Sequence, residues 1–289
     1  MKKNLKNSAE KQDKKVIQLE ELSWKNIEKL DREKTIFFIP ISPLEEHGPH
    51  LPVGTDYLTA KDTAKSAAEI LVKKKPGFTY VLFPAIPIGY CKMTSCFPGT
   101  ISTRVKAIRN IIYDVCSSLA RYGFQYFVIC TFHMDIGHLK GIYTGIDRLK
   151  RKFDVKIVEP MGPYFFNDEV EKNEPKMEFD TKKEKHGGFR ETSLMKYQYP
   201  YLVDESYKEL QSVYRDLYSP RYLGKTFEDI GIKDGYIGSP AQADSDYGRW
   251  YFHDVVGIYV KAVNDLIEGK ELPTLPRQVK MIMRSIFWL

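Results

Sequence analysis

The sequence predicts an α/β fold in which helices cover both faces of a parallel sheet. Short apolar runs rich in β-branched and aromatic residues recur along the chain, beginning with TIFFIPIS at residues 35–42. Segments in which apolar residues recur at helical spacing separate these runs. Strands that alternate with helices form parallel sheets buried on both faces. Such sheets place binding sites at the carboxyl ends of their strands.

The length and composition fit one globular domain preceded by a basic tail. The 289 residues can bury a sizeable core, and 43% hydrophobic with 28% charged residues is typical of a soluble chain. Residues 1–15 hold six lysines and two acids, which gives +4 of the net charge of +6. We expect this tail to be disordered. We expect residues 16–289 to form a single domain, since no linker divides them.

Composition also argues against several classes of partner. Outside the tail, the best basic run is LKRKF at 149–153, which resembles the solvated end of a helix, so we expect no nucleic-acid partner. No apolar run reaches about 18 residues, so we expect no membrane partner. The basic start lacks the apolar segment of a signal peptide. The cysteines form no CxxC pair, which favours reduced thiols and a cytoplasmic location; they are Cys91, Cys96, Cys116 and Cys130.

The first expected elements lead to a loop rich in potential metal ligands. This loop, EEHGPHLPVGTD at 45–56, contains two prolines and two glycines, which exclude a helix there. Around it we expect a short helix at 21–30 with Ser23 as N-cap, a strand at 35–42 and a helix at 57–74.

The remaining elements repeat the alternation and then become irregular. We expect strands at 79–89, 124–132 and 153–160, and helices at 103–122 and 138–152. Beyond them we expect irregular segments at 160–185 and 205–240, a helix that begins near Glu191, and a closing helix at 244–268.

Five of the six histidines fall in three short glycine-containing loops, each of which also holds an acid. Histidine and carboxylate together suit Zn²⁺ or Mn²⁺, and the lack of cysteine in these loops argues against a structural zinc site. We expect His50, His138 and His253 to be structural. The remaining candidates are Glu45, His47, Asp56, His133, Asp135, His186 and Glu191.

The spacing of these residues has a geometric meaning. Glu45 and His47 are two residues apart on an extended segment, so their side chains project to one side. Gly54 allows the chain to double back and bring Asp56 to the same point. His133 and Asp135 repeat the spacing after another strand. These five ligands are enough for two metal ions that share Asp56, an arrangement that activates water and polarises a carbonyl group.

These motifs resemble those of the creatininase family of metal-dependent amidohydrolases. EEHGPHLPVGTD after FFIPIS is close to the family signature, and KHGGFRETSLM is close to its segment with a histidine and Glu-Thr-Ser. TFHMDIGH resembles a divergent form of the Asn-Gly-His motif. FPGTIS at 97–102 and GSPAQADSDYGRW match further family segments. The resemblance runs from about residue 18 to 268.

The resemblance implies a three-layer α/β/α sandwich and a centre with two divalent ions, Zn²⁺ or Mn²⁺ with Fe²⁺ as a further option. Glu45, Asp56 and His133 would hold one ion, and His47, Asp56 and Asp135 the other. His186 would be catalytic, and Glu191 would be a catalytic residue or an extra ligand. The resemblance also implies a homo-oligomer, with a hexamer as one form.

The chain departs from the family pattern where substrate would bind. Thr131-Phe132 replaces Asn-Gly, Asp135 replaces a longer Glu, and Met134 replaces an aromatic residue. The loop before FPGT offers Ser95 in place of a histidine. We therefore expect Ser95 and Met134 to contact a small-molecule substrate other than creatinine.

The expected activity is hydrolysis of a small cyclic amide or formamide by metal-activated water. One alternative is ring-opening hydrolysis of a cyclic ketone such as a keto-inositol. A second is a degenerate, non-catalytic metal-binding homologue. A third is a nucleophilic hydrolase that uses Cys91, Cys96 or Ser95, although no G-x-S-x-G elbow is present.

Overall fold

The centre of the molecule is a five-stranded parallel sheet in the order β1-β3-β2-β4-β5. The structure is a computed structural model that describes residues 16–217, 220–222 and 224–286, so the predicted basic tail lies outside the described residues. The strands are β1 (Ile17–Gln18), β2 (Thr35–Pro40), β3 (Thr79–Leu82), β4 (Tyr126–Cys130) and β5 (Lys156–Val158). The predicted parallel sheet is confirmed.

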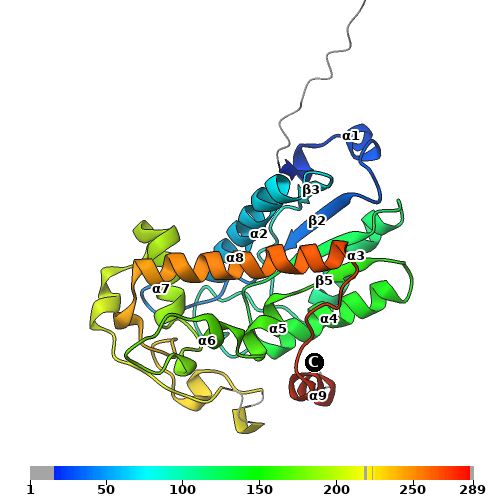
Figure 1. The fold of residues 1–289 in the computed structure, drawn as a ribbon. Helices are drawn as coiled ribbons and strands as arrows, with labels where there is room; N and C mark the ends of the chain where they lie inside the picture. The colour runs from blue at the N-terminus through cyan, green and yellow to red at the C-terminus, as the bar shows by residue number, and fades with distance from the viewer. Residues whose placement is uncertain (1–15, 218–219, 223, 287–289) are drawn as a thin grey trace, which may run out of the picture.

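Helices cover both faces of this sheet (Figure 1). On one face lie α3 (Val105–Ala120) and α4 (Ile136–Lys150), and on the other lie α2 (Thr55–Lys74) and α8 (Ser245–Ile267). The alternation along β2 explains this arrangement, because Phe37 packs in the core with α3 and α4 while Phe38 packs in the core with α2 and α8. The predicted three-layer sandwich is confirmed.

Several predicted elements are present with shifted bounds. Helix α1 (Trp24–Glu28) is capped as expected, because the Ser23 hydroxyl accepts from the Asn26 amide at 3.3 Å. Helix α2 begins at Thr55, so Asp56 lies in its first turn instead of in the preceding loop. The strand expected at 79–89 ends at Leu82, because Pro84 and Pro87 cannot donate ladder hydrogen bonds.

The second half of the chain is more helical than expected. The segment at 160–185 contains α5 (Met161–Phe166) and α6 (Glu169–Asn173), and α7 (Phe189–Gln198) follows it. A further helix, α9 (Arg277–Ser285), comes after α8, so the prediction that the chain closes at 244–268 is wrong. Short 3₁₀ turns lie at Leu19–Glu21, Thr181–Lys183, Pro200–Leu202, Glu205–Glu209, Pro220–Tyr222, Glu228–Ile230 and Pro240–Gln242.

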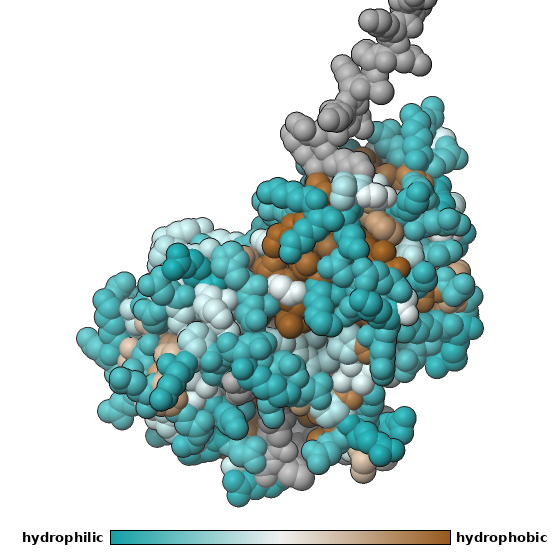
Figure 2. All heavy atoms as spheres, in the orientation of Figure 1, coloured by the Kyte–Doolittle hydropathy of each residue, from teal (hydrophilic) through white to brown (hydrophobic). Residues whose placement is uncertain are grey.

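The surface is mostly hydrophilic on the face drawn in Figure 2, where hydrophobic side chains gather over the junction of α2 and α8. We expected His253 on α8 to be a core or an interface residue; it is exposed, so a core position is wrong, and an interface position stays a prediction. In the part of the chain that the structure describes, every helix is too short or too polar to cross a lipid bilayer.

Candidate metal centre

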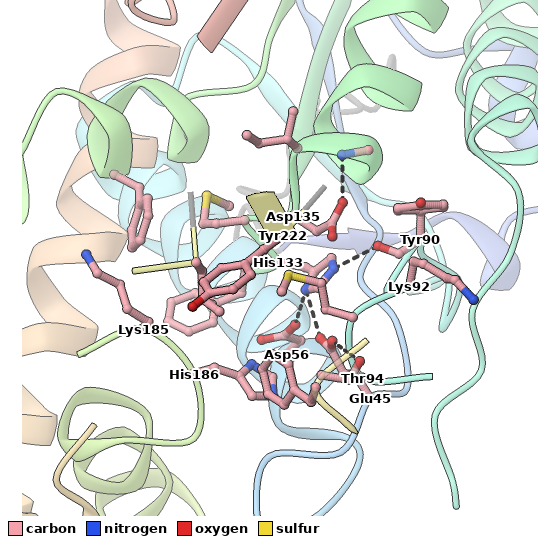
Figure 3. A pocket seen from close by; sticks show the side chains of 18 of the residues that line it. Glu45, Asp56, Tyr90, Lys92, Thr94, His133, Asp135, Lys185, His186 and Tyr222 are labelled. Atoms are coloured by element: carbon pink, nitrogen blue, oxygen red, sulfur yellow. Dashed lines mark hydrogen bonds and ion pairs between the residues drawn. The ribbon is translucent and has the colours of Figure 1, made fainter. Parts of the chain in front are cut away.

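The candidate metal ligands meet at the carboxyl edge of the sheet (Figure 3). Glu45 and His47 follow β2, His133 follows β4, and Asp56 lies in the first turn of α2. These segments emerge side by side because Pro40 of β2 pairs with Cys130 of β4. His186 and Glu191 approach from the start of α7. We call these six residues the donor cluster: Glu45, His47, Asp56, His133, His186 and Glu191.

Asp56 lies between two imidazoles. His133 Nδ1 is 2.9 Å from Asp56 Oδ2 and 2.9 Å from Glu45 Oε2. His47 Nε2 is 3.3 Å from Asp56 Oδ1 and 3.8 Å from Glu191 Oε2. The donor cluster contains three groups whose ligand atoms lie within 4.8 Å of one another: Glu45, His47 and His186; Glu45, Asp56 and His133; and His47, Asp56 and Glu191.

The donor cluster contains buried polar atoms that lack hydrogen bonds. Among the described residues, Glu45 Oε2, His47 Nε2 and Asp56 Oδ1 are buried without such a partner. Buried polar atoms of this kind are rare, because their desolvation is costly. Imidazole nitrogens and carboxylate oxygens are ligands of Zn²⁺ and Mn²⁺. The residues present therefore fit a divalent metal.

Backbone carbonyls orient both imidazoles. His47 Nδ1 lies 2.9 Å from the Glu45 carbonyl oxygen, and His133 Nε2 lies 2.9 Å from the Tyr90 carbonyl oxygen. A ring N–H that donates to each carbonyl leaves the other ring nitrogen facing the acids, as in metal-binding histidines. Thr94 donates to Glu45 Oε1 in a short hydrogen bond. Sequence analysis missed Tyr90 and Thr94, because a backbone carbonyl and a lone threonine give no pattern.

Mutual charge favours the ionised forms of Glu45, His47 and Asp56. Burial raises the pKa of Glu45, but the charge and hydrogen bond of His133, together with the charges of His186 and His47, outweigh it and the pKa falls to about 2. Burial lowers the pKa of His47, but Asp56 and Glu191 outweigh it and raise the pKa to about 10. Burial is likewise outweighed at Asp56, where His47 holds the pKa well below its usual range.

His186 reaches the donor cluster through a tight glycine turn. Its ring centroid lies 4.3 Å from that of His47, and its Nε2 lies 2.7 Å from the Glu46 carbonyl oxygen. Gly187 has φ of 57°, and a Cβ there would lie 2.7 Å from the His47 carbonyl oxygen. Only glycine permits this approach. The Gly187 amide donates to Glu191 Oε2 at 2.5 Å, which fixes that carboxylate.

Asp135 does not join these groups. Its Oδ1 accepts from the amides of Gly137 at 2.6 Å and His138 at 3.2 Å, so it caps the N-terminus of α4. Burial raises its pKa to about 6. The predicted i, i+2 projection fails because Asp135 is the N-cap of α4 and its side chain turns back to the backbone amides. Glu191, instead of Asp135, lies beside His47 and Asp56.

The other expected residues divide between lining and structural positions. Met134 lines the cavity above the donor cluster, whereas Ser95 is exposed and donates to the Lys92 carbonyl oxygen at 2.7 Å. Ser95 is not among the described residues that line the cavity. The contact between Ser95 and substrate stays a prediction, and the exposed position of Ser95 outside this lining does not favour it.

The two loop histidines assigned structural roles make side-chain hydrogen bonds. His50 Nε2 lies 2.7 Å from Thr192 Oγ1, and His138 Nε2 lies 3.2 Å from Thr131 Oγ1. Burial raises the pKa of the Cys91 thiol to about 12, which keeps it protonated at neutral pH and disfavours it as a nucleophile.

A cavity of about 310 Å³ opens above the donor cluster. Its lining includes the aromatic side chains of Tyr90, Phe132 and Tyr251. The cationic side chains in this lining are Lys92, Lys185 and Lys225. Figure 3 shows Lys92 and Lys185 on opposite sides of the group formed by Asp56 and His133. A ligand above the donor cluster would therefore meet apolar surface and lysines at the sides.

The chain matches known proteins over most of its length. The family model for creatinine amidohydrolase, named Creatininase, matches residues 20–263. Creatinine amidohydrolase of Pseudomonas putida is 28% identical over 200 residues, which cover 64% of this chain and 72% of that protein. The mycofactocin precursor peptide peptidase of Mycobacterium ulcerans (strain Agy99) is 34% identical over 86 residues, 28% of this chain and 34% of that protein.

Solved structures show the same fold. A structure named Creatininase Mn matches with a TM-score of 0.68 and 23% identity, covering 87% of this chain and 98% of its own. A mutant creatininase of the Zn-Zn type matches with a TM-score of 0.66 and 23% identity over the same shares. The sandwich and its layer order are thus shared with these proteins.

Proposed function

The chain belongs to the creatininase family, and on this premise we propose that it is a hydrolase that cleaves a C–N bond of a small amide with two divalent ions. The observation that carries the proposal is the set of buried, unbonded atoms of Glu45, His47 and Asp56 at one point. Without a cation there, charge contacts within the donor cluster would compensate the desolvation of these atoms only in part, since none of the three atoms makes a hydrogen bond.

The donor atoms divide into two sets that share Asp56. Glu45, Asp56 and His133 would hold one ion, and His47, Asp56 and Glu191 the other. Manganese and zinc forms of creatininase support Zn²⁺ or Mn²⁺ here, with Fe²⁺ as an alternative. Two such ions lower the pKa of a water and polarise a carbonyl oxygen.

His186 is placed to deliver a proton to the leaving nitrogen. Burial and the neighbouring His47 lower its pKa, but the Glu46 and Glu45 carboxylates outweigh both and raise the pKa above its usual value. The raised pKa favours the protonated imidazole, and His186 lines the same cavity as the donor cluster. A proton donor within reach of the leaving group is what amide cleavage requires.

Cyclic amides and formamides are the substrate classes that we favour. The relative that is a precursor peptide peptidase makes a linear peptide amide a second candidate. The three lysines among the described lining residues suit a neutral or anionic substrate better than a cation. Ring opening of a cyclic ketone and a non-catalytic role remain alternatives for experiment to separate. We also propose assembly into a homo-oligomer, with a hexamer as one form, and sedimentation can measure the assembly.

Metal content provides the decisive experiment. Wild-type protein and Asp56→Asn are loaded with Zn²⁺ or Mn²⁺, desalted and assayed by plasma mass spectrometry, with exposed Asp114→Asn as the matched control. We expect about two ions per chain in wild type and the control. We expect no more than one in Asp56→Asn. Equal metal content in all three proteins would refute the shared carboxylate.

A substrate panel then separates the alternative functions. Lactams, cyclic ureides, formamides, short peptides and keto-inositols are each incubated with the loaded protein. Turnover of an amide supports the proposal, and turnover of the ketone alone would replace it. Loaded protein that turns over none of these compounds would favour the non-catalytic alternative.

A further inference from the structure

We propose that the cavity takes an amide that carries a bulky apolar substituent, and that α9 supplies part of the wall that recognises it. This inference rests on the proposed function and names its substrate class. We call five apolar residues of the cavity lining the outer wall: Met161, Phe165, Phe227, Ile282 and Ile286.

The outer wall is built from segments that are distant in sequence. Met161 and Phe165 come from α5, while Ile282 comes from α9 and Ile286 follows it directly. Phe227 is buried and its ring meets His186 edge-on, with 5.5 Å between centroids. The outer wall therefore reaches the proposed proton donor through Phe227 and draws its other residues from α5 and from α9 with the residue after it.

Helix α9 is fixed in place by its own amphipathic pattern. Val279, Ile282, Met283 and Ile286 follow the i, i+3, i+4, i+7 spacing of one helix face. Val279 and Met283 are buried in a cluster that includes residues of α4 and α5. Part of this face thus anchors α9, and the other part, Ile282 and Ile286, is left to line the cavity.

A hydrogen bond from a half-buried lysine fixes the end of α9. Lys140 Nζ on α4 donates to the Ile286 carbonyl oxygen at 2.6 Å, and Ile286 is 1% exposed. Figure 1 shows α9 below α4 and α5, reached by an extended segment after α8. The helix is therefore held against the body of the molecule on the side where the cavity opens.

Helix α9 lies beyond the part of the chain that matches the family. The match ends at residue 263, and α9 begins at Arg277. The donor cluster falls within the matched segment, and this part of the wall lies outside it. We therefore expect α9 to affect which substrates bind more than which bond is cleaved.

The chemistry of the outer wall identifies the class of substituent. Its five side chains are aromatic, aliphatic or thioether groups that cannot hydrogen-bond a small polar ring. A volume of about 310 Å³ is at the lower end for drug-sized ligands. An aromatic or branched aliphatic substituent of several carbons would bury this surface, and each buried methylene favours binding by about fourfold.

Matched formamides test the proposal through turnover. Formamide, N-butylformamide and N-(2-phenylethyl)formamide present the same C–N bond with increasing apolar size. We expect kcat/KM to rise at least about tenfold from the first to the last. Equal values across the series would overturn the inference while leaving the proposed function intact.

Hydroxamate binding tests the proposal without turnover. Acetohydroxamate and 3-phenylpropionohydroxamate are titrated into the metal-loaded protein by calorimetry, so the result does not depend on whether formamides are hydrolysed. We expect the phenyl compound to bind at least about tenfold more tightly. Equal affinities would overturn the inference, whereas failure of all formamides alongside selective binding would overturn only the formamide assignment.

Variants of α9 locate the recognition. Ile282→Ala should remove about threefold to tenfold of the phenyl preference. Met281 lies on the same helix and is 67% exposed, so Met281→Ala should leave the phenyl preference unchanged. Ser285→Phe adds bulk at an exposed lining position and should weaken only the larger ligand, which covers the case in which Ile282→Ala does not fold. Identical preferences in Ile282→Ala, Ser285→Phe and Met281→Ala would refute the role of α9.

Discussion

The donor cluster and the outer wall line one cavity and are built in opposite ways. The donor cluster is polar, drawn from the ends of β2 and β4 and the starts of α2 and α7, and fixed by backbone hydrogen bonds. The outer wall is apolar and comes in part from α5 and α9, outside the central sheet. On the two proposals above, the edge of the sheet fixes the reaction, whereas the peripheral helices set the substrate.

The largest effect should come from removing the proton donor that joins the two regions. We expect His186→Ala to lower kcat by about 10²–10⁴, because general acid catalysis contributes that much. Metal content should stay at the wild-type level if the two ions use the ligand sets that share Asp56. Single-turnover rates and plasma mass spectrometry on the same sample measure both quantities.

His253→Ala is the matched control for this prediction. His253 is an exposed histidine on α8 and is not among the described residues that line the cavity. It should leave rate and metal content unchanged. Loss of an ion from His186→Ala would move His186 from proton transfer to metal binding, in the group it forms with Glu45 and His47. Full activity in His186→Ala would remove it from the mechanism.

The donor cluster was largely predictable because strand ends obey simple geometry. Parallel strands deliver the residues that follow them to one edge, so Glu45, His47 and His133 had to converge once β2 and β4 were recognised as neighbours. Asp56 was predicted by its position after Gly54, although the helix begins one residue before it. The family motifs pointed to the same residues.

The outer wall and Asp135 were harder to predict for physical reasons. Residues 268–276 separate α9 from α8, and nothing in the pattern of Ile282 and Ile286 shows which surface they cover. The Asp135 carboxylate could either bind a metal ion or cap α4. It caps α4, because it accepts hydrogen bonds from the amides of Gly137 and His138. Spacing alone does not reveal this competition, because it depends on where α4 begins.

An acid outside the donor cluster shows what the imidazoles contribute. Glu159 follows β5 at the same sheet edge and accepts from Tyr143 Oη at 3.0 Å and the Met161 amide at 2.7 Å. Burial raises its pKa from 4.5 to about 7, whereas Glu45 beside His133 falls to about 2. Between pH 4.5 and about 7 the native state therefore holds a proton that the unfolded chain releases.

The contribution of Glu159 to stability should consequently fall as pH rises through this window and level off above it. The contribution of Glu159 is up to about 3 kcal/mol, the second-largest effect. We expect Glu159→Gln, which keeps hydrogen-bonding atoms at both positions, to lack this pH dependence in urea denaturation. Parallel pH profiles for wild type and Glu159→Gln would show that Glu159 does not titrate in this range.

The assignment of the second ion gives a smaller and sharper test. We expect Glu191→Gln to lower the affinity for one of the two metal ions by at least about tenfold, because the Glu191 carboxylate lies beside His47 and Asp56. Asp135→Asn should leave both affinities unchanged. Competition with a chromogenic chelator measures the two affinities. The reverse result would restore the arrangement that the family resemblance implies, with Asp135 as a ligand.

The smallest effect separates the cap of α4 from any role in metal binding. Asp135→Ala removes the acceptor for the amides of Gly137 and His138 and should cost about 1 kcal/mol of unfolding free energy. Asp135→Asn should cost much less, since asparagine caps helices as well as aspartate does. When unfolding is measured in the presence of a chelator, no metal ion is bound. The difference in unfolding free energy between the two variants then reports only the capping of α4. If alanine and asparagine were equally destabilising, the charge of Asp135 would matter and not its cap, and the division between a polar donor cluster and a structural Asp135 would fail.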